Sequence, residues 1–377
     1  TFSKRAAILA GVTYFVAAIG YAGFYKPISR THVRTPEYTY GYMIAWAAEF
    51  LAYDTDVVLA DAIAKASGRS HLLTKSERPL EFGDDIVVIQ VESLDFDALN
   101  ATSQNELVMP FLHDLKERSM FYMVEPFHFT GTCDADFSLL TASPPNGIIT
   151  PFKVYGFPYD RALPRLVSEL GYSPSAIHGN TGGFFQRRAA YQQMGFSKLY
   201  FGEELKEYSI NGRHDHELFN LSAKLINESP EPIFHFIITW TSHGPFKRLP
   251  PETEELIPEP NDRHELYLNN MRYVDDSLER YYEQLPENTT VVIYGDHHSD
   301  VTGYVEGEVH ANRVPWIICR KDEDLSTQQK TMQTGLAMSG ELGQLEMVCF
   351  LWDNLEAAVK VADQKESEHD RLDEIPQ

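Results

Sequence analysis

Carboxylates and imidazoles recur directly after short apolar runs, and these residue types can hold a divalent cation. Four runs are followed by Glu92, by His178, by a segment containing His243, and by the pair Asp296 and His297. Mixed carboxylate and imidazole ligands suit manganese or zinc. Each residue taken alone fits a solvated loop, a helix cap or a hydrogen-bonded core position equally well. Their repetition after successive runs favours a metal site.

The segment GTCDADF, residues 131–137, adds a hydroxyl to this set. Thr132 precedes a predicted helix whose first turn holds Asp134 and Asp136, so its hydroxyl meets the positive end of the helix dipole. A threonine there can cap the helix through its side chain. It can also act as a nucleophile, provided that a metal stabilises its alkoxide. Local sequence leaves both interpretations open.

These residues need a scaffold that brings distant segments to one edge. From residue 84 onward, short β-branched runs alternate with helical patterns, which predicts a mostly parallel sheet covered by helices. In such sheets, ligands collect at the carboxyl ends of the strands. The predicted strands cover 86–91, 121–124, 175–179, 233–239, 290–296 and 314–319, and the predicted helices cover 109–119, 163–171, 216–227 and 266–285.

Composition narrows the choice of partner. The net charge of −23 excludes nucleic acid as a general partner, and an enzyme acting on phosphates would need local cations or a metal. The three cysteines, Cys133, Cys319 and Cys349, form no CxxC pair and so no zinc framework.

The N-terminus predicts a membrane anchor. Residues 6–25 are uncharged and long enough to cross a bilayer, although a signal peptide or a buried helix remain alternatives. Lys4 and Arg5 favour a cytoplasmic N-terminal side. We therefore expect a transmembrane helix over 1–25, ending what could be a larger membrane domain. A helical connector over 26–83, an extracytoplasmic catalytic domain over 84–361 and a charged tail over 362–377 would follow it.

The order of motifs resembles one family. VES, MPFL, GTCDADF, HGN with FFQRR, SHGPF and GDHH, spread over residues 84–318, resemble the lipoteichoic acid synthase family of phosphoglycerol transferases. That family lies within the alkaline phosphatase and sulfatase superfamily. The resemblance implies an α/β fold of that type, with a mostly parallel sheet sandwiched by helices.

The resemblance also implies roles for individual residues. The implied metal ligands are Glu92, Thr132, Asp296 and His297, with Thr132 as the nucleophile. The implied substrate pocket contains His178, Phe185, Arg187, His243 and His310, and His243 is also a candidate proton donor. Phe185 stands where the family often has tryptophan. The adjacent histidines His128, His235 and His298 are interpreted as neighbours of the site, outside the ligand set.

The implied activity is transfer of phosphoglycerol from phosphatidylglycerol, through a phosphothreonine, to a hydroxyl of an envelope glycan or glycolipid. One divalent cation is implied, with manganese expected and zinc or magnesium as alternatives. The implied location is the bacterial inner membrane, with the domain on its periplasmic or outer side.

Three alternatives stay open. The motif SHGPF is closer to phosphoethanolamine transferases, which use a different lipid headgroup. A sulfatase-like hydrolase of phosphodiesters or sulfate esters could use the same residues. However, the cysteine-containing motif of sulfatases requires an arginine where this chain has Phe137. A catalytically silent envelope scaffold or sensor would keep the fold without the chemistry.

Overall fold

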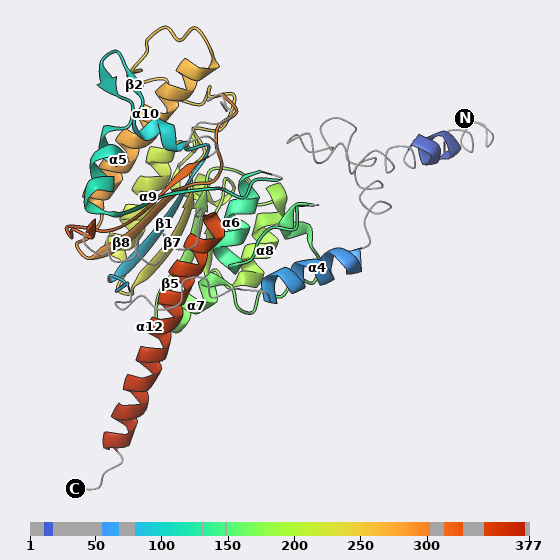
Figure 1. Ribbon diagram of the computed structural model, residues 1–377, viewed down its shortest axis with the longest axis vertical. Helices are drawn as coiled ribbons and strands as arrows, with labels where there is room; N and C mark the ends of the chain where they lie inside the picture. The colour runs from blue at the N-terminus through green and yellow to red at the C-terminus, as the bar shows by residue number, and fades with distance from the viewer. Residues whose placement is uncertain are drawn as a thin grey trace.

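A seven-stranded sheet forms the centre of the domain (Figure 1). The computed structural model describes residues 11–17, 55–67, 80–129, 131–147, 149–301, 313–326 and 343–373. The strands lie in the order β4-β9-β8-β1-β7-β5-β6. All neighbouring pairs from β8 to β6 are parallel, whereas β9 is antiparallel to both β8 and β4. The strands are β1 (Asp85–Val91), β4 (Met120–Val124), β5 (Ser173–His178), β6 (Lys198–Tyr200), β7 (Ile233–Ile238), β8 (Thr289–Gly295) and β9 (Val314–Arg320).

Helices cover both faces of the sheet because its central strands are apolar on both sides. In β1, Ile86 and Val88 belong to one core cluster, while Val87 and Ile89 belong to the other. The first cluster takes in α4 (Thr55–Ser67), α6 (Thr132–Thr141), α7 (Leu163–Glu169), α8 (Arg187–Met194) and the start of α12 (Gln344–Asp373). The second takes in α5 (Pro110–Leu115), α9 (Asp215–Glu228) and α10 (Arg263–Gln284).

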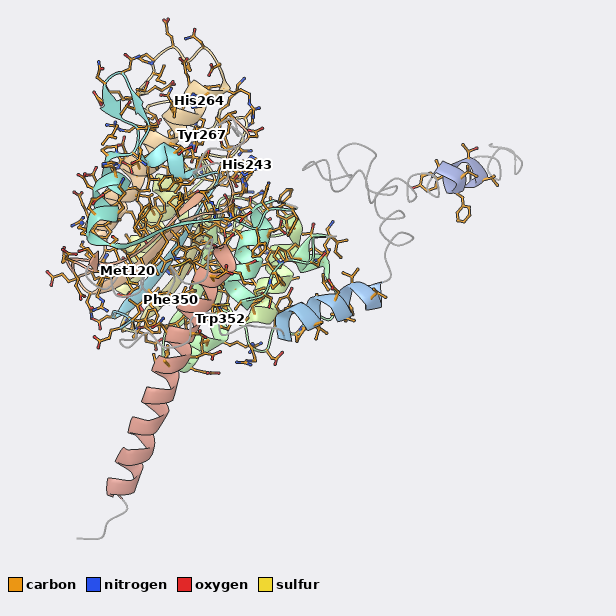
Figure 2. All side chains as sticks on the ribbon, viewed as in Figure 1. Met120, His243, His264, Tyr267, Phe350 and Trp352 are labelled. Atoms are coloured by element: carbon orange, nitrogen blue, oxygen red, sulfur yellow. The ribbon has the colours of Figure 1, made fainter. Side chains whose placement is uncertain are left out.

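Side chains fill the space between these layers (Figure 2). Met120, Phe350 and Trp352 are buried in the first cluster, and the Trp352 indole N–H donates to the Leu139 carbonyl at 2.8 Å. This bond ties α12 to α6, the helix that begins at Thr132. A short hairpin of β2 (Thr102–Ser103) and β3 (Glu106–Leu107) lies apart from the main sheet.

The predicted α/β fold with a mostly parallel sheet is confirmed. Within the predicted connector, α4 packs on the domain through Val58 and Ala62. In the predicted tail, α12 continues as a helix to Asp373, and Figure 1 shows it projecting from the domain.

Only residues 11–17 of the predicted membrane span lie in the described part of the chain, where they are helical. Among the described residues, no helix combines the length and apolar character needed to cross a bilayer. The transmembrane helix therefore stays a prediction.

Candidate active site

The carboxyl ends of four adjacent parallel strands bring most of the predicted site residues together. Glu92 follows β1, and Asp296 and His297 follow β8, its neighbour. On the other side of β1, the segment containing His243 follows β7, and His178 ends β5. Parallel pairing places these ends at one edge, as the sequence predicts.

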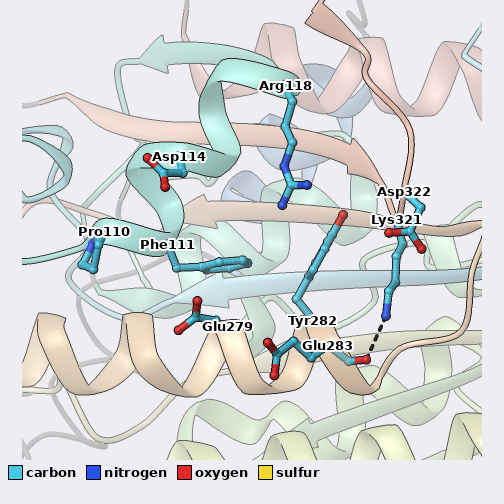
Figure 3. Close-up of a pocket in the computed structure, with 9 residues that line it drawn as sticks. All are labelled: Pro110, Phe111, Asp114, Arg118, Glu279, Tyr282, Glu283, Lys321 and Asp322. Atoms are coloured by element: carbon cyan, nitrogen blue, oxygen red, sulfur yellow. Dashed lines mark hydrogen bonds between the residues drawn. The ribbon is translucent and has the colours of Figure 1, made fainter.

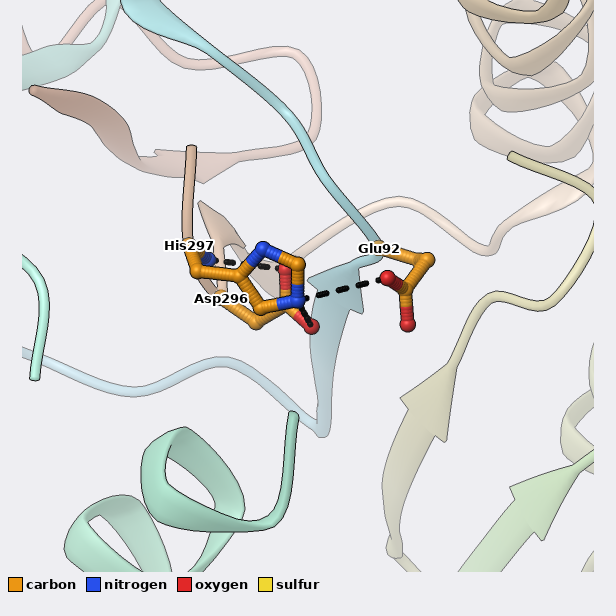
Figure 4. Close-up of side chains that lie close together, drawn as sticks. All are labelled: Glu92, Asp296 and His297. Carbon is orange, nitrogen blue, oxygen red and sulfur yellow. Dashed lines mark hydrogen bonds and ion pairs between the residues drawn. The ribbon is translucent and has the colours of Figure 1, made fainter. Parts of the chain in front are cut away.

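Glu92, Asp296 and His297 form a compact cluster of potential metal ligands (Figure 4). Their ligand atoms lie within 4.8 Å of one another. His297 Nε2 is 3.3 Å from Glu92 Oε1 and 3.5 Å from Asp296 Oδ2. The other ring nitrogen, Nδ1, lies 2.9 Å from the His298 carbonyl oxygen, so it carries the hydrogen and Nε2 faces the carboxylates.

The donor set fits one divalent cation. Asp296 Oδ2 is buried and accepts no hydrogen bond from the described residues, as expected for an atom reserved for a ligand. Asp296 Oδ1 accepts the main-chain N–H groups of Ser93 and His297, both at 2.8 Å. Ser93, whose φ is +57°, also donates its hydroxyl to Glu92 Oε1 at 2.9 Å. Ser93 therefore orients two of the three candidate ligands.

The protonation of His297 is coupled to these carboxylates. Burial alone would lower the pKa of His297. The nearby Asp296 and Glu92 carboxylates outweigh this effect and raise the pKa of His297 to about 10. Burial raises the pKa of Glu92, but the hydrogen bond from His297 and the charges of His243 and His297 hold it well below its usual range. Burial and then the charge of Glu92 raise the pKa of Asp296 to about 7. Without a metal, the His297 imidazolium thus offsets the charge of Glu92, and Asp296 gains a proton as the pH falls below about 7.

Metal binding should therefore release a proton. A coordinating histidine must be neutral, whereas His297 stays protonated up to its raised pKa of about 10 in the metal-free protein. Because protons compete with the metal at His297 and, below about pH 7, also at Asp296, affinity for Mn²⁺ should rise by about tenfold per pH unit between roughly pH 7.5 and 8.5 and more steeply below pH 7. Calorimetric titration with Mn²⁺, in buffers of different ionisation enthalpy, measures both the affinity and the number of protons released. A pH-independent affinity without proton release would contradict this prediction.

Gly295, the last residue of β8, allows the end of this strand to pack closely against its neighbours, which places Asp296 in the cluster. A Cβ at Gly295 would overlap the Leu94 carbonyl oxygen and lie 2.9 Å from Val314 Cβ. Gly295→Ala should therefore displace the strand end, lowering Mn²⁺ affinity by about tenfold and the free energy of unfolding by about 1–3 kcal/mol. Metal titration and urea unfolding measure these effects. Gly183→Ala is the control because only the Thr181 hydroxyl lies near the added atom, at 3.9 Å. Wild-type metal affinity in Gly295→Ala would refute the steric argument.

Thr132 is the first residue of α6, and its hydroxyl does not cap the helix. The N-cap residue is Gly131, whose φ of +131° favours glycine. Instead, Thr132 Oγ1 donates a hydrogen bond to Glu92 Oε2 at 2.9 Å. The Gln90 side-chain amide donates a hydrogen bond to the Thr132 carbonyl at 3.2 Å. The hydroxyl is thus directed at the metal-ligand cluster from the N-terminus of a helix.

Arg187 lies in a buried polar group beside α6. Its Nε donates to Asp136 Oδ2 at 2.8 Å, and its Nη1 lies 3.5 Å from His178 Nε2. Tyr191 donates to the same Asp136 oxygen at 2.5 Å. Arg187 Nη2 is buried without a hydrogen-bond partner among the described residues, so it can still donate to an anion.

His178 is neutral in this environment. Burial and then the charge of Arg187 lower the pKa of His178 to about 3. Its Nδ1 lies 3.0 Å from the Ile238 carbonyl, which fixes that nitrogen as the donor. His178 can therefore accept a hydrogen bond at Nε2, but it cannot act as an acid near pH 7.

Phe185 and His243, two of the remaining predicted pocket residues, lie in the same region. The Arg187 guanidinium carbon lies 5.2 Å from the centre of the Phe185 ring. A Cβ at Gly131 would lie 3.6 Å from Phe185, so this ring sits beside the turn that precedes Thr132. His243 Nδ1 contacts the Gly244 carbonyl at 2.7 Å, which leaves Nε2 available. His310 lies outside the described residues.

Sequence reasoning missed one residue of the site, Asp136. The His128 ring centre lies 4.2 Å from that of His297, which agrees with the interpretation of His128 as a neighbour of the site. Asp136 belongs to the motif GTCDADF but had no predicted role, and the structure pairs it with Arg187. Helical spacing could have pointed to Asp136, because it lies four residues after Thr132 and so shares its helix face. His235, also interpreted as a neighbour, is instead buried within β7, where its Nδ1 lies 2.7 Å from the Ser222 hydroxyl.

A hollow of about 460 Å³ lies at the opposite edge of the sheet (Figure 3). Its lining includes Phe111, Arg118, Tyr282 and Lys321. Lys321 follows β9, and its main-chain N–H bonds the carbonyl of Thr289, the first residue of β8. Lys321 Nζ is engaged with the carbonyls of Glu283 and Leu285. The hollow contains no predicted site residue.

Comparisons with known proteins agree with the fold and the motifs. A family model described as sulfatase matches residues 84–370, more than half of the chain. Lipoteichoic acid synthase of Staphylococcus saprophyticus is 28% identical over 232 residues, covering 57% of this chain and 36% of that protein. Lipoteichoic acid synthase 2 of Bacillus subtilis is 24% identical over 283 residues, covering 69% of this chain and 43% of that protein. The chain thus spans less than half the length of these two curated relatives.

Solved structures show the same fold. The lipoteichoic acid synthase LtaP of Listeria monocytogenes superposes with a TM-score of 0.59 at 19% identity, covering 78% of this chain and 81% of that one. The Streptococcus pyogenes phosphoglycerol transferase GacH, in complex with sn-glycerol-1-phosphate, gives a TM-score of 0.50 at 17% identity, covering 81% and 93%. The resemblance seen in the motifs is confirmed: the chain belongs to the sulfatase family, as a lipoteichoic acid synthase-like member of the alkaline phosphatase and sulfatase superfamily.

Proposed function

We propose that the chain is a metal-dependent phosphotransferase that moves phosphoglycerol from phosphatidylglycerol to a hydroxyl of an envelope glycan or glycolipid. The observation that carries this proposal is the Thr132 hydroxyl, which lies at a helix N-terminus and 2.9 Å from Glu92 in the ligand cluster. The names of the relatives, lipoteichoic acid synthase and phosphoglycerol transferase, support the choice of transferred group.

The metal would be held by Glu92, Asp296 and His297, with Thr132 joining them as the nucleophile. We expect manganese, with zinc or magnesium as alternatives. Such a cation supplies positive charge that favours the threonine alkoxide and polarises a phosphoryl oxygen. Among the chain's own groups, Ser93 and the His298 carbonyl keep the ligands oriented.

Two displacements at phosphorus complete the transfer. Thr132 Oγ1 loses its proton to water and attacks the phosphorus of the lipid, and the bond from phosphorus to the diacylglycerol oxygen breaks. That oxygen takes a proton from His243 Nε2, and phosphoglycerol stays on Thr132. The acceptor hydroxyl oxygen then attacks the same phosphorus, and the bond to Thr132 Oγ1 breaks. Arg187 Nη2 offsets charge on the phosphoryl oxygens. His243 Nε2 exchanges a proton with the leaving or attacking oxygen, while its Nδ1 stays on the Gly244 carbonyl.

The predicted membrane span over residues 6–25 suits a lipid donor. It would hold the domain at the outer face of the inner membrane, where phospholipid headgroups are accessible. The net charge of −23 gives the domain no general attraction to an anionic bilayer, so a covalent anchor would supply the proximity.

The experiment is to capture the intermediate. Mn²⁺-loaded protein is incubated with phosphatidylglycerol or phosphatidylethanolamine without acceptor, and the peptide containing Thr132 is analysed by mass spectrometry. A phosphoglycerol adduct on Thr132 is expected. A phosphoethanolamine adduct without a phosphoglycerol adduct would identify phosphatidylethanolamine as the donor in place of phosphatidylglycerol. The absence of an adduct with either lipid would overturn the proposal. An adduct that water resolves as fast as any acceptor would instead identify a hydrolase.

A further inference from the structure

Gln90 is a buried polar side chain in an otherwise apolar part of β1. It is the last residue but one of that strand, and none of its surface is exposed. A parallel strand covered on both faces is normally apolar throughout, because burying an amide costs free energy unless its donors and acceptors are bonded. The hydrogen bonds of Gln90 therefore indicate what this residue does in the strand. Its neighbours in β1 follow the apolar rule, since they are Ile86, Val87, Val88, Ile89 and Val91.

Two buried groups fix the orientation of the Gln90 amide. Its Nε2 donates to the Thr132 carbonyl at 3.2 Å, and its Oε1 accepts from the Tyr294 hydroxyl at 2.5 Å. The Thr132 carbonyl can only accept, so the NH₂ group has to face it and the amide oxygen has to face Tyr294. Tyr294 is the register partner of Gln90 on β8, and its ring stacks on that of Trp316 in β9 with 4.6 Å between the ring centres. Both aromatic side chains are fully buried, so they hold the amide in one position.

The segment formed by β1 and the residue after it holds the proposed nucleophile at two points. Gln90 bonds the main-chain carbonyl of Thr132, and Glu92, two residues further along, accepts a hydrogen bond from the Thr132 hydroxyl at 2.9 Å. Thr132 is β-branched, so its hydroxyl can take few positions once its main chain is fixed. The direction of Oγ1 thus depends on the position of the carbonyl that Gln90 holds.

These two contacts differ in how they fare during the proposed reaction. Thr132 Oγ1 loses its proton when it attacks and is bonded to phosphorus afterwards, so in neither state can it donate to Glu92. The Thr132 carbonyl takes no part in the bond changes, and its hydrogen bond from Gln90 can persist. Gln90 can therefore hold Thr132 both while the phosphoryl group arrives and while it leaves.

We propose that Gln90, oriented by Tyr294, is a positioning residue that keeps Thr132 Oγ1 in line with the phosphorus through both displacements. This inference rests on the proposed phosphotransferase function and adds a residue that acts on its rate through the main chain of the nucleophile. Gln90 is not one of the clustered metal-ligand candidates, so its loss should slow the displacements and leave the affinities for lipid and cation nearly unchanged. A shift of about 1 Å at a reacting atom can cost about a hundredfold in rate.

The test measures the rate at which the Thr132 adduct forms in a single turnover. Mn²⁺-loaded protein is mixed with saturating phosphatidylglycerol without acceptor, and the adduct is followed over time by mass spectrometry. Gln90→Met keeps the length of the side chain but removes both hydrogen bonds, and it should slow adduct formation by about thirtyfold or more. The lipid concentration that gives half the maximal rate and the affinity for Mn²⁺ should stay within about threefold of wild type. A wild-type rate in Gln90→Met, or a loss confined to lipid or metal affinity, would overturn the positioning role.

A double variant separates positioning from stability. Gln90→Met leaves the buried Tyr294 hydroxyl without its acceptor, which lowers stability, and adding Tyr294→Phe removes that unpaired group. The double variant should regain stability in urea unfolding, while adduct formation stays as slow as in Gln90→Met. Recovery of the rate together with stability would show that Gln90 only supports the fold.

Asn354→Leu is the matched control, because it removes a buried amide that also bonds two partners. Asn354 Oδ1 accepts the Leu80 N–H at 2.6 Å, and its Nδ2 donates to the Phe350 carbonyl at 2.8 Å. This variant should lose stability and keep the rate of adduct formation within about twofold of wild type. A slowing equal to that of Gln90→Met would attribute both effects to stability and overturn the inference. A wild-type protein that forms no adduct would instead overturn the proposed function, and this inference with it.

Discussion

Thr132→Ala should abolish the headgroup adduct and lower the rate of transfer at least about a thousandfold. The substitution removes the one oxygen that the proposed mechanism bonds to phosphorus, and water cannot occupy its place as part of a covalent intermediate. The folded domain should persist, because the side chain contributes one hydrogen bond, to Glu92, worth about 1 kcal/mol. Transfer kinetics and mass analysis of the peptide check both expectations.

Two variants control this experiment. Thr132→Ser keeps the hydroxyl and should retain activity within roughly tenfold of wild type. Thr141→Ala alters the same residue type at the other end of α6, where the hydroxyl bonds the Phe137 carbonyl at 2.7 Å. It should lower stability slightly and keep activity. Wild-type transfer by Thr132→Ala would show that another group, or water, attacks phosphorus.

Much of the fold follows from local pattern. The run IVVIQV predicts a buried strand, and β1 spans Asp85–Val91, because a strand covered on both faces must be apolar throughout. By contrast, β6 has only three residues, Lys198–Tyr200, at the edge of the sheet, and a run that short carries no periodic signal. The antiparallel direction of β9 was likewise not predicted, because strand composition does not encode direction.

The candidate site was predictable to the extent that strand ends determine it. Glu92, Asp296 and His297 meet because β1 and β8 are parallel neighbours. The alternating pattern predicts parallel strands whose carboxyl ends share one edge, but it does not predict that these two strands are adjacent. Contacts between loops and helices could not be predicted in this way. Arg187 meets Asp136 across 51 positions of sequence, and His128 meets His297 from a loop. Such pairs depend on how α6 and α8 pack, which no local pattern specifies.

The pair formed by Arg187 and Asp136 is the most buried ion pair among the residues that the structure describes, so its loss should strongly destabilise the domain. Both side chains are at most 1% exposed, and their charges are 2.8 Å apart. Asp136→Asn would leave a buried guanidinium without its counter-ion, so the free energy of unfolding should fall by about 3–5 kcal/mol. Urea unfolding followed by circular dichroism measures this loss. A loss under about 1 kcal/mol would mean that water or another anion compensates Arg187.

A double variant separates stability from catalysis at this pair. Arg187→Met alone leaves the Asp136 carboxylate buried with only the Tyr191 hydroxyl among its described hydrogen-bond donors, so it should be both unstable and inactive. Adding Asp136→Asn removes the unpaired charge and keeps an acceptor for Tyr191, so stability should largely return. Activity should remain about a hundredfold or more below wild type, because Nη2 is still missing from the phosphate. If activity returned together with stability, Arg187 would serve to hold α6 against α8 and would not bind the transferred group.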